Sequence, residues 1–123
     1  MDAGATDIVR KTRWLIDENL GSNLSITWLG EMEGFNPYYL ARVYKQLTGE
    51  NLKDRIAQAR IQRARALLAS GKHVNREIAA LVGFTSEQAF YRFFKSMTSM
   101  TPGEYQKWSE THKGENAANP STN

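Results

Sequence analysis

Four side chains that form directional hydrogen bonds share one face of a predicted short helix within residues 83–95, GFTSEQAFYRFFK. An arginine fork and a carboxamide can each bond two atoms at once, and a carboxylate accepts from an amino group. Guanine, adenine and cytosine present such atoms along the major groove of DNA. We interpret this stretch as a helix offered to DNA, and the interpretation rests on the residues that precede it; the exposed polar residues are Glu87, Gln88, Tyr91 and Arg92.

The residues before this face predict the turn that positions it. Residues 78–82 form an apolar helical run in which Ala79 precedes Gly83 by four positions. Two steeply crossing helices need a small side chain where their backbones meet, and the turn between them needs a residue that tolerates positive φ. We expect Thr85 to be the N-cap of the next helix, with Gln88 completing a capping box. This spacing is typical of a helix-turn-helix.

The same pattern occurs a second time, earlier in the chain. Residues 29–35 align with residues 78–84 at an offset of 49, and after the turn the offset becomes 50. Arg42 then corresponds to Arg92, and Lys45 corresponds to Lys95. An internal repeat of this kind predicts two copies of one helix-turn-helix unit.

The remaining signals predict an all-α fold of about seven helices, in which a long central helix joins two helix-turn-helix subdomains. Good capping residues predict where four of the helices start: Ser25, Asn36-Pro37, Asn75 and Thr101-Pro102. The first helix, residues 7–19, should cover the first helix-turn-helix. The expected division is a linker at 1–6, a DNA-binding domain at 7–108 and a disordered polar tail at 109–123; within the domain, the helix-turn-helices lie at about 25–47 and 75–97 and the joining helix at 52–70.

The joining helix has a length that bears on function. Nineteen helical residues span roughly 28 Å. One turn of B-DNA measures about 34 Å. Two DNA-reading helices attached at opposite ends of this helix would therefore be separated by close to one turn of DNA.

Composition narrows the classes of function. The chain of 123 residues has a net charge of +3, and residues 36–72 contain eight basic and two acidic residues, which suits a surface facing phosphate. There is no cysteine, and His73 and His112 have no partners at ligand spacing, so we expect no metal site, no cofactor and no enzymatic activity. No apolar run is long enough to span a membrane, which predicts a cytoplasmic protein.

The combination of motifs resembles the DNA-binding domain of AraC/XylS-type bacterial transcription regulators. The resemblance covers about residues 7–108 and rests on the paired helix-turn-helices and two motifs, Arg60-Ile61-x-x-Ala64-x-x-Leu67-Leu68 and Ile78-Ala79-x-x-Val82-Gly83-Phe84 with the following residues to Tyr105. Two further motifs are similar to those of family members in which this domain is the output domain of a response regulator. These motifs are Asn36-Pro37-x-Tyr39-Leu40 and residues 48–51. The chain departs from the usual pattern at four residues: Gly30, Arg55, Ser99 and Gln106.

The resemblance implies that both recognition helices, residues 37–47 and 86–97, enter adjacent major grooves of an operator. Arg42 and Arg92 are expected to bond guanine, and Gln88 to pair with adenine. Glu87 could accept from cytosine N4 or complement the positive end of its helix. By the family motif, Tyr38, Ala41, Ala89 and Tyr91 also line the groove, while Lys45, Lys95 and Tyr39 are expected to contact phosphate.

Other functions remain open at this stage. The repeat could serve protein association, docking RNA polymerase or a sensory domain while DNA contact stays minor. RNA polymerase is an expected partner in either case, together with a sensory or receiver domain absent from this chain. A DNA-repair enzyme that transfers alkyl groups would need a thiolate, and the chain has no cysteine. We expect the aromatic residues at helical spacing, including Phe90 and Phe94, to form the core.

Overall fold

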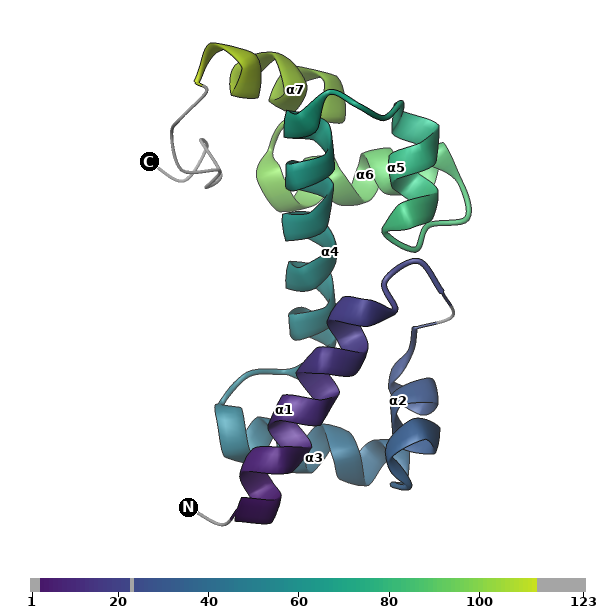
Figure 1. The fold of residues 1–123 in the computed structure, drawn as a ribbon, viewed down its shortest axis with the longest axis vertical. Helices are drawn as coiled ribbons and strands as arrows, with labels where there is room; N and C mark the ends of the chain where they lie inside the picture. Colours follow the sequence, from purple (N-terminus) through teal and green to yellow (C-terminus); the bar gives the residue numbers. More distant parts are fainter. Residues whose placement is uncertain (1–2, 23, 113–123) are drawn as a thin grey trace. The chain divides into compact units, whose positions relative to one another are not determined.

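The computed structural model describes residues 3–22 and 24–112, and these ranges contain seven α-helices and no strand (Figure 1). The prediction of an all-α fold of about seven helices is confirmed. Within the described part of the chain, no helix combines the length and the hydropathy of a membrane span. The helices are α1 (Ala3–Glu18), α2 (Ile26–Glu33), α3 (Pro37–Thr48), α4 (Leu52–Ser70), α5 (Asn75–Leu81), α6 (Glu87–Thr98) and α7 (Pro102–Thr111).

The chain divides into two compact units, residues 1–59 and residues 60–123. In the first unit, α1, α2 and α3 pack around Leu29, Leu40 and Tyr44, all fully buried. In the second unit, α5, α6 and α7 pack around an aromatic core that includes Phe90 and Phe94. A fully buried large apolar side chain contributes about 1.5–3 kcal/mol relative to exposure. Each repeat copy therefore has a hydrophobic core of its own.

Helix α4 contributes to both cores in turn. Leu52 and Ile56, near its start, are buried with the first core, whereas Ile61, Ala64 and Leu68 are buried with the second. Both predicted bounds of this helix are confirmed. It begins after Asn51, whose Oδ1 accepts from Lys53 N at 2.9 Å, and it ends before Gly71, which has φ +68°. An amide cap at one end and a left-handed glycine at the other are strong helix boundaries.

Several other helix starts agree with the sequence. The Ser25 side chain accepts from Trp28 N at 3.0 Å, and Asn36 Oδ1 accepts from Tyr38 N at 2.9 Å ahead of Pro37. Thr101 and Glu104 form the expected capping box, in which Glu104 Oε1 accepts from Thr101 N at 2.8 Å. The bond from Thr101 N and the Thr101 hydroxyl lower the pKa of Glu104.

Two predicted N-caps are wrong. Helix α6 is capped by Ser86, whose hydroxyl oxygen accepts from Ala89 N at 3.1 Å; Thr85 lies outside the helix, so the capping box expected of Thr85 and Gln88 is wrong as well. Helix α5 already includes Asn75, so Val74 occupies the N-cap position. Valine offers no side-chain acceptor, and instead Glu77 Oε1 accepts from Val74 N at 3.0 Å. A carboxylate in the first turn therefore replaces the expected amide cap.

Several helix boundaries extend past the predictions, among them the end of α6, which lies at Thr98 rather than at residue 97. Helix α1 begins at Ala3, so residues 3–6 of the expected linker are helical; alanine has the highest helix propensity. Helix α3 includes Thr48, and α7 continues to Thr111 into the segment predicted to be a disordered tail. The rest of that tail, residues 113–123, lies outside the described residues.

Candidate nucleic-acid interface

The turns of both helix-turn-helices share one backbone pattern. Phe35 N donates to Gly30 O at 2.8 Å, and Phe84 N donates to Ala79 O at 2.8 Å. Gly34 and Gly83 have φ of +77° and +97°, the left-handed region in which glycine is unstrained. The predicted repeat of a small residue followed by a glycine is thus confirmed as a repeat of the turn.

Gly30 has less space for a side chain than its counterpart in the second copy, Ala79. A Cβ atom placed on Gly30 would lie 2.6 Å from Phe35 O, which is a backbone atom of the same turn. The second copy holds a methyl group at Ala79, which is buried. The first copy therefore brings its two backbones closer together than the second.

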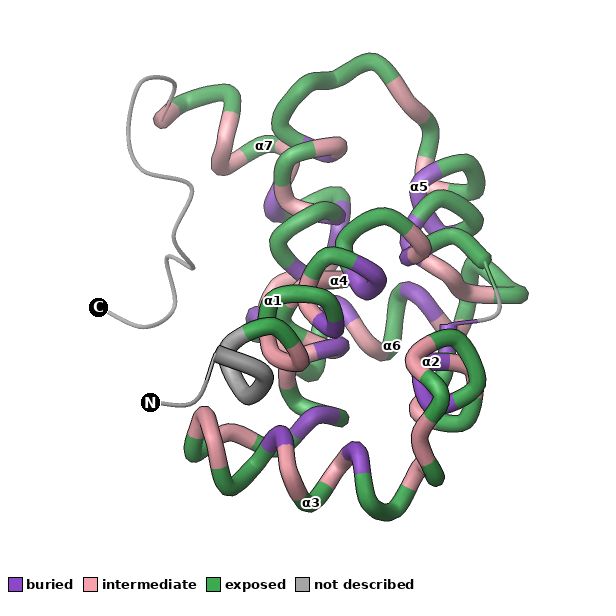
Figure 2. The backbone as a smooth tube through the Cα atoms, turned by 60° about the horizontal axis from the view of Figure 1, so that its bottom comes forward, coloured by how far each residue is buried: buried purple, intermediate pink, exposed green. Residues whose placement is uncertain are grey.

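Helix α3 presents the polar face that its sequence predicts. Its buried residues are Leu40 and Tyr44, and exposed and buried stretches alternate along the helix (Figure 2). Tyr38 is 85% exposed, Arg42 and Lys45 are exposed, and Ala41 is half-buried. All of these side chains except Ala41 are thus readily available to a ligand.

Tyr39 differs from its neighbours, because its ring lies close to two other side chains. It is 42% exposed, its ring lies 5.5 Å from the Phe35 ring, and the Arg42 guanidinium lies over it at 5.8 Å. The spacing of three residues places Tyr39 and Arg42 on neighbouring positions of the helix surface.

Helix α6 presents the second polar face. It buries Phe90, Phe94 and Thr98, which leaves Lys95 exposed near its end and Ala89 half-buried. The structure brings together the residues that the sequence singled out first. They line one open hollow of about 380 Å³, and its lining residues are Glu87, Gln88, Tyr91 and Arg92.

The C-terminal ends of α3 and α6 are built alike. The Thr48 hydroxyl donates to Tyr44 O at 2.7 Å and accepts from Glu50 N at 3.1 Å. Fifty residues later, the Thr98 hydroxyl donates to Phe94 O at 2.8 Å and accepts from Met100 N at 3.1 Å. The repeat therefore extends to the hydrogen bonds that end each recognition helix.

The two ends differ in the residue that follows Thr48 and Thr98. Gly49 caps α3 at φ +79°, and Ser99 caps α6 at φ +65°. Each cap N–H bonds the carbonyl of the preceding lysine, Lys45 or Lys95. A serine in the left-handed region is strained, so this departure from the family pattern has a local cost.

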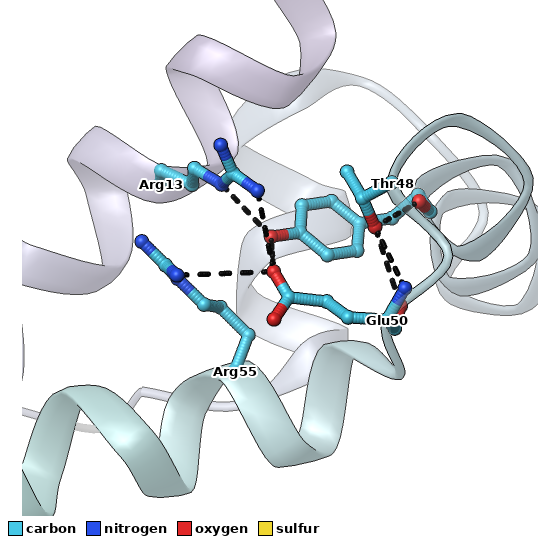
Figure 3. A network of polar contacts seen from close by, with 5 residues as sticks. Arg13, Thr48, Glu50 and Arg55 are labelled. Carbon is cyan, nitrogen blue, oxygen red and sulfur yellow. Dashed lines mark hydrogen bonds and ion pairs between the residues drawn. The ribbon is translucent and has the colours of Figure 1, made fainter.

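A polar network supports α3 in the first unit (Figure 3). Tyr44 Oη donates to Glu50 Oε2 at 2.6 Å, and Arg13 Nη2 and Arg55 Nη1 lie 3.3 and 3.8 Å from the same oxygen. The Tyr44 bond, followed by Arg13 and Arg55, lowers the pKa of Glu50, and burial raises the pKa of Tyr44. The network ties α1 and the start of α4 to the segment that follows α3.

A second polar contact joins α1 to α2. The Thr12 hydroxyl lies 2.9 Å from both carboxylate oxygens of Glu33, and Thr12 is fully buried. Burial raises the pKa of Glu33, because the charged carboxylate is partly removed from water. Helix α1 thus covers the first helix-turn-helix, as the sequence predicts.

The second unit is supported by aromatic contacts instead. Phe94 meets Tyr105 edge-on at 5.5 Å, and Phe84 lies 4.9 Å from Phe93. The Arg60 guanidinium lies 5.7 Å from the Phe84 ring, and burial lowers the pKa of Arg60. The prediction that these aromatic residues form the core is confirmed.

Sequence reasoning did not single out Arg13 and Glu50 as supports of the interface. Arg13 bonds a residue 31 positions away, and no local periodicity reveals such a pair. Among the described residues, no cluster of three or more His, Cys, Asp or Glu side chains could hold a metal ion. His112 instead stacks on Trp108 at 4.5 Å.

Comparison with known proteins defines the class. Residues 29–107 match the family described as "Helix-turn-helix domain", and the chain belongs to the AraC-type branch of this family, whose members bind DNA and regulate transcription. The regulatory protein SoxS of Escherichia coli is 31% identical over 90 residues, which cover 73% of this chain and 84% of SoxS.

Two further relatives are associated with longer regulators. YesN of Bacillus subtilis, an uncharacterized transcriptional regulatory protein, is 31% identical over 107 residues, which cover 85% of this chain but 29% of YesN. The C-terminal domain of AraT, a response regulator from Geobacillus stearothermophilus, superposes with a TM-score of 0.78 at 28% identity, covering 82% of this chain and 84% of that domain.

Proposed function

We propose that this chain binds a specific double-stranded DNA operator and regulates transcription, with α3 and α6 entering adjacent major grooves. The observation that carries this proposal is the repeat of one turn that leaves equivalent polar faces exposed on both helices. A major groove admits one α-helix, and exposed side chains on that helix read the base edges.

In this proposal α3 reads bases mainly through Arg42. Its guanidinium can bond guanine O6 and N7 together, while Tyr38 reaches a base edge or a thymine methyl group and Ala41 lines the groove. Lys45 contacts phosphate, and the Tyr39 hydroxyl contacts phosphate as well. Phosphate contacts fix the position of the helix without reading sequence.

Helix α6 reads a second half-site with the side chains that line the hollow described above. Arg92 bonds guanine, Gln88 pairs with adenine, and Glu87 accepts from cytosine N4. Tyr91 and Ala89 line the groove, and Lys95 contacts phosphate. A carboxylate facing DNA is repelled by the backbone phosphates, so Glu87 favours a half-site that offers it an amino group.

The length of α4 supports simultaneous binding to two half-sites. Its 19 residues correspond to roughly 28 Å of helix, close to the 34 Å of one DNA turn. The eight basic residues between 36 and 72 add a sequence-independent attraction to phosphate.

Base reading can be separated from phosphate contact by titration. Arg42→Ala and Arg92→Ala should each cost about 1–3 kcal/mol on a cognate duplex and little on random DNA. Lys95→Ala should weaken both duplexes alike and flatten the slope of log affinity against log salt by about one. The measurement is fluorescence anisotropy at two salt concentrations, with a cognate duplex selected from a random pool. Equal losses on both duplexes for the arginine variants would contradict the assignment of base contacts.

Regulation also requires partners. We propose RNA polymerase as one, and a sensory or receiver domain as another, because YesN is much longer than this chain and AraT is a response regulator. The role requires no catalytic group and places the protein with the bacterial chromosome in the cytoplasm.

One observation favours protein association as a second function. Trp14 on α1 is 60% exposed and lines a hollow of about 400 Å³ with Asp7, Arg10 and Lys11. Exposed tryptophan and arginine are common anchors of protein interfaces. Trp14→Ala should leave operator affinity unchanged and lower transcription from the operator; a matched loss of operator affinity would assign Trp14 to DNA binding instead.

A further inference from the structure

The ring of Tyr39 lies close both to the ring of Phe35, at the turn, and to the guanidinium of Arg42, on the reading face. The Phe35 and Tyr39 ring centroids are 5.5 Å apart with an interplanar angle of 41°, and the Arg42 guanidinium lies 5.8 Å from the Tyr39 centroid. A guanidinium within about 6 Å of a ring centroid is attracted to the face of the ring. Phe35 itself packs against the core of the first unit. A column of three side chains thus connects the core to the guanidinium.

The second repeat lacks this column. The position equivalent to Tyr39 is Ala89, and among the described residues no ring stacks with Arg92. The ring equivalent to Phe35 is Phe84, which faces Arg60 of helix α4 instead. The two reading arginines therefore occupy equivalent positions with different support.

We propose that Tyr39 is a positioning residue that holds the Arg42 guanidinium ready to read its base, and so sets the specificity of the first half-site. The inference rests on the proposed function and adds a role for the ring that is distinct from any phosphate contact of the hydroxyl. An arginine side chain loses much rotamer freedom on binding, and a ring that already restricts it reduces this loss. The resulting increase in affinity is specific to duplexes that carry the base read by Arg42.

The decisive measurement is a discrimination ratio: the affinity for the cognate duplex divided by the affinity for a duplex altered only at the base pair read by Arg42. A phosphate contact affects both duplexes equally and cancels in the ratio. Tyr39→Phe keeps the ring and removes the hydroxyl, so its ratio should equal that of the unmodified protein. Tyr39→Leu removes the ring and should lower the ratio about two- to fivefold, the range for an exposed cation–π contact.

The double variant tests whether the ring acts through Arg42. In the Arg42→Ala background, Tyr39→Leu should leave the ratio unchanged, because the group that it positions is absent. An unchanged ratio in Tyr39→Leu, an equal fall in Tyr39→Phe, or the same fall in the Arg42→Ala background would each overturn the inference. If Arg42→Ala alone leaves the ratio intact, the base contact of the proposed function fails too, so the two failures are distinguishable.

A second measurement uses only the unmodified protein and does not depend on whether a variant folds. Aromatic ring currents should shift the NMR resonances of the Arg42 δ-methylene protons upfield in the free, unmodified protein, and the Arg92 δ-methylene protons should show no such shift. Arg42 resonances at random-coil positions would overturn the inference without any binding experiment.

Discussion

At the scale of single residues, Ser99 carries a backbone strain that its counterpart avoids. Ser99 has φ +65° and ψ +9°, close to the φ +79° and ψ −6° of Gly49. The left-handed conformation costs an L-residue roughly 1–2 kcal/mol, whereas glycine adopts it freely. The backbone that ends α6 is therefore more strained than the backbone that ends α3.

Ser99→Gly should raise the free energy of unfolding by about 0.5–1 kcal/mol, because the relief of strain exceeds the added entropy of the unfolded chain. Urea denaturation measures the change. The matched control is Gly49→Ser, which should destabilise by a similar amount; the added Cβ meets no atom within 4 Å, so the cost comes from the backbone alone. Destabilisation by Ser99→Gly would contradict this account.

Glu50 makes the stability of the first unit depend on pH. Its pKa is lowered in the folded state, chiefly by the Tyr44 hydroxyl and also by Arg13 and Arg55. The stabilisation is therefore complete above the unfolded pKa of about 4.3 and is lost as the pH falls through the lower folded pKa. Glu50→Gln should destabilise at pH 7 by roughly 1 kcal/mol, discounted for partial exposure, and much less in the acid range.

Urea denaturation of Glu50→Gln at neutral and acid pH gives the two values. Glu33→Gln is the control of opposite sign, because burial raises the Glu33 pKa. The stability that Glu33 contributes in its protonated form is present at low pH and is lost as the pH rises through the folded pKa of Glu33. A Glu50→Gln penalty that stays constant across this range would assign the effect to packing.

The exposed faces could be predicted from the sequence, because the apolar residues of each helix recur at helical spacing and leave the reading residues opposite. Leu40 and Tyr44 mark the buried side of α3, and Phe90 and Phe94 mark that of α6. The bond between Arg13 and Tyr44 could not be predicted, because it joins helices that only the tertiary fold brings together. The stack of Tyr39 and Arg42 is local, but a spacing of three residues does not specify the rotamers that form it.

At the scale of helices, the boundaries depend on which of several neighbouring residues makes the capping bond. Thr85 and Ser86 are both good caps, and the sequence cannot decide between them; the structure selects Ser86 because its hydroxyl reaches Ala89 N. The bounds of α4 were predictable because one strong signal stands at each end, Asn51 and Gly71. Single, unambiguous signals fix a helix boundary better than clusters of equivalent ones.

The crossing of α2 and α3 gives a prediction at this scale. Gly30→Ala should destabilise by about 1–3 kcal/mol, because the new methyl group would lie 2.6 Å from Phe35 O and 3.3 Å from Pro37 N. The first turn would have to open, so operator affinity should fall as well. The reverse change in the second copy, Ala79→Gly, should cost about 1–2 kcal/mol, because it lowers helix propensity and removes a buried methyl group, but it should leave the turn closed.

Thermal denaturation and operator titration of both variants measure these effects. A Gly30→Ala protein with unchanged stability would show that the turn relaxes around the methyl group. The contact at Gly30 would then have no influence on the placement of α3.

At the scale of the whole chain, the proposed reading of DNA by both α3 and α6 predicts two half-sites in a fixed register. Their centres should lie about 10–10.5 base pairs apart, one turn of DNA. Inserting five base pairs between the half-sites places them on opposite faces of the duplex, and affinity should fall to that of one half-site. Anisotropy titrations with duplexes carrying insertions of five and ten base pairs test this. An affinity independent of the insertion would mean that only one helix reads DNA.

Helix α4 is one continuous helix whose first residues are buried in one core and whose last residues are buried in the other. Each residue added to an α-helix advances its end by about 1.5 Å and rotates it by about 100°. A single insertion between Ile56 and Ile61 would therefore turn the residues of α4 that enter one core by about 100° relative to those that enter the other, whereas replacing its exposed side chains leaves this register unchanged. The number of residues in this segment is therefore more constrained than the identity of its exposed side chains.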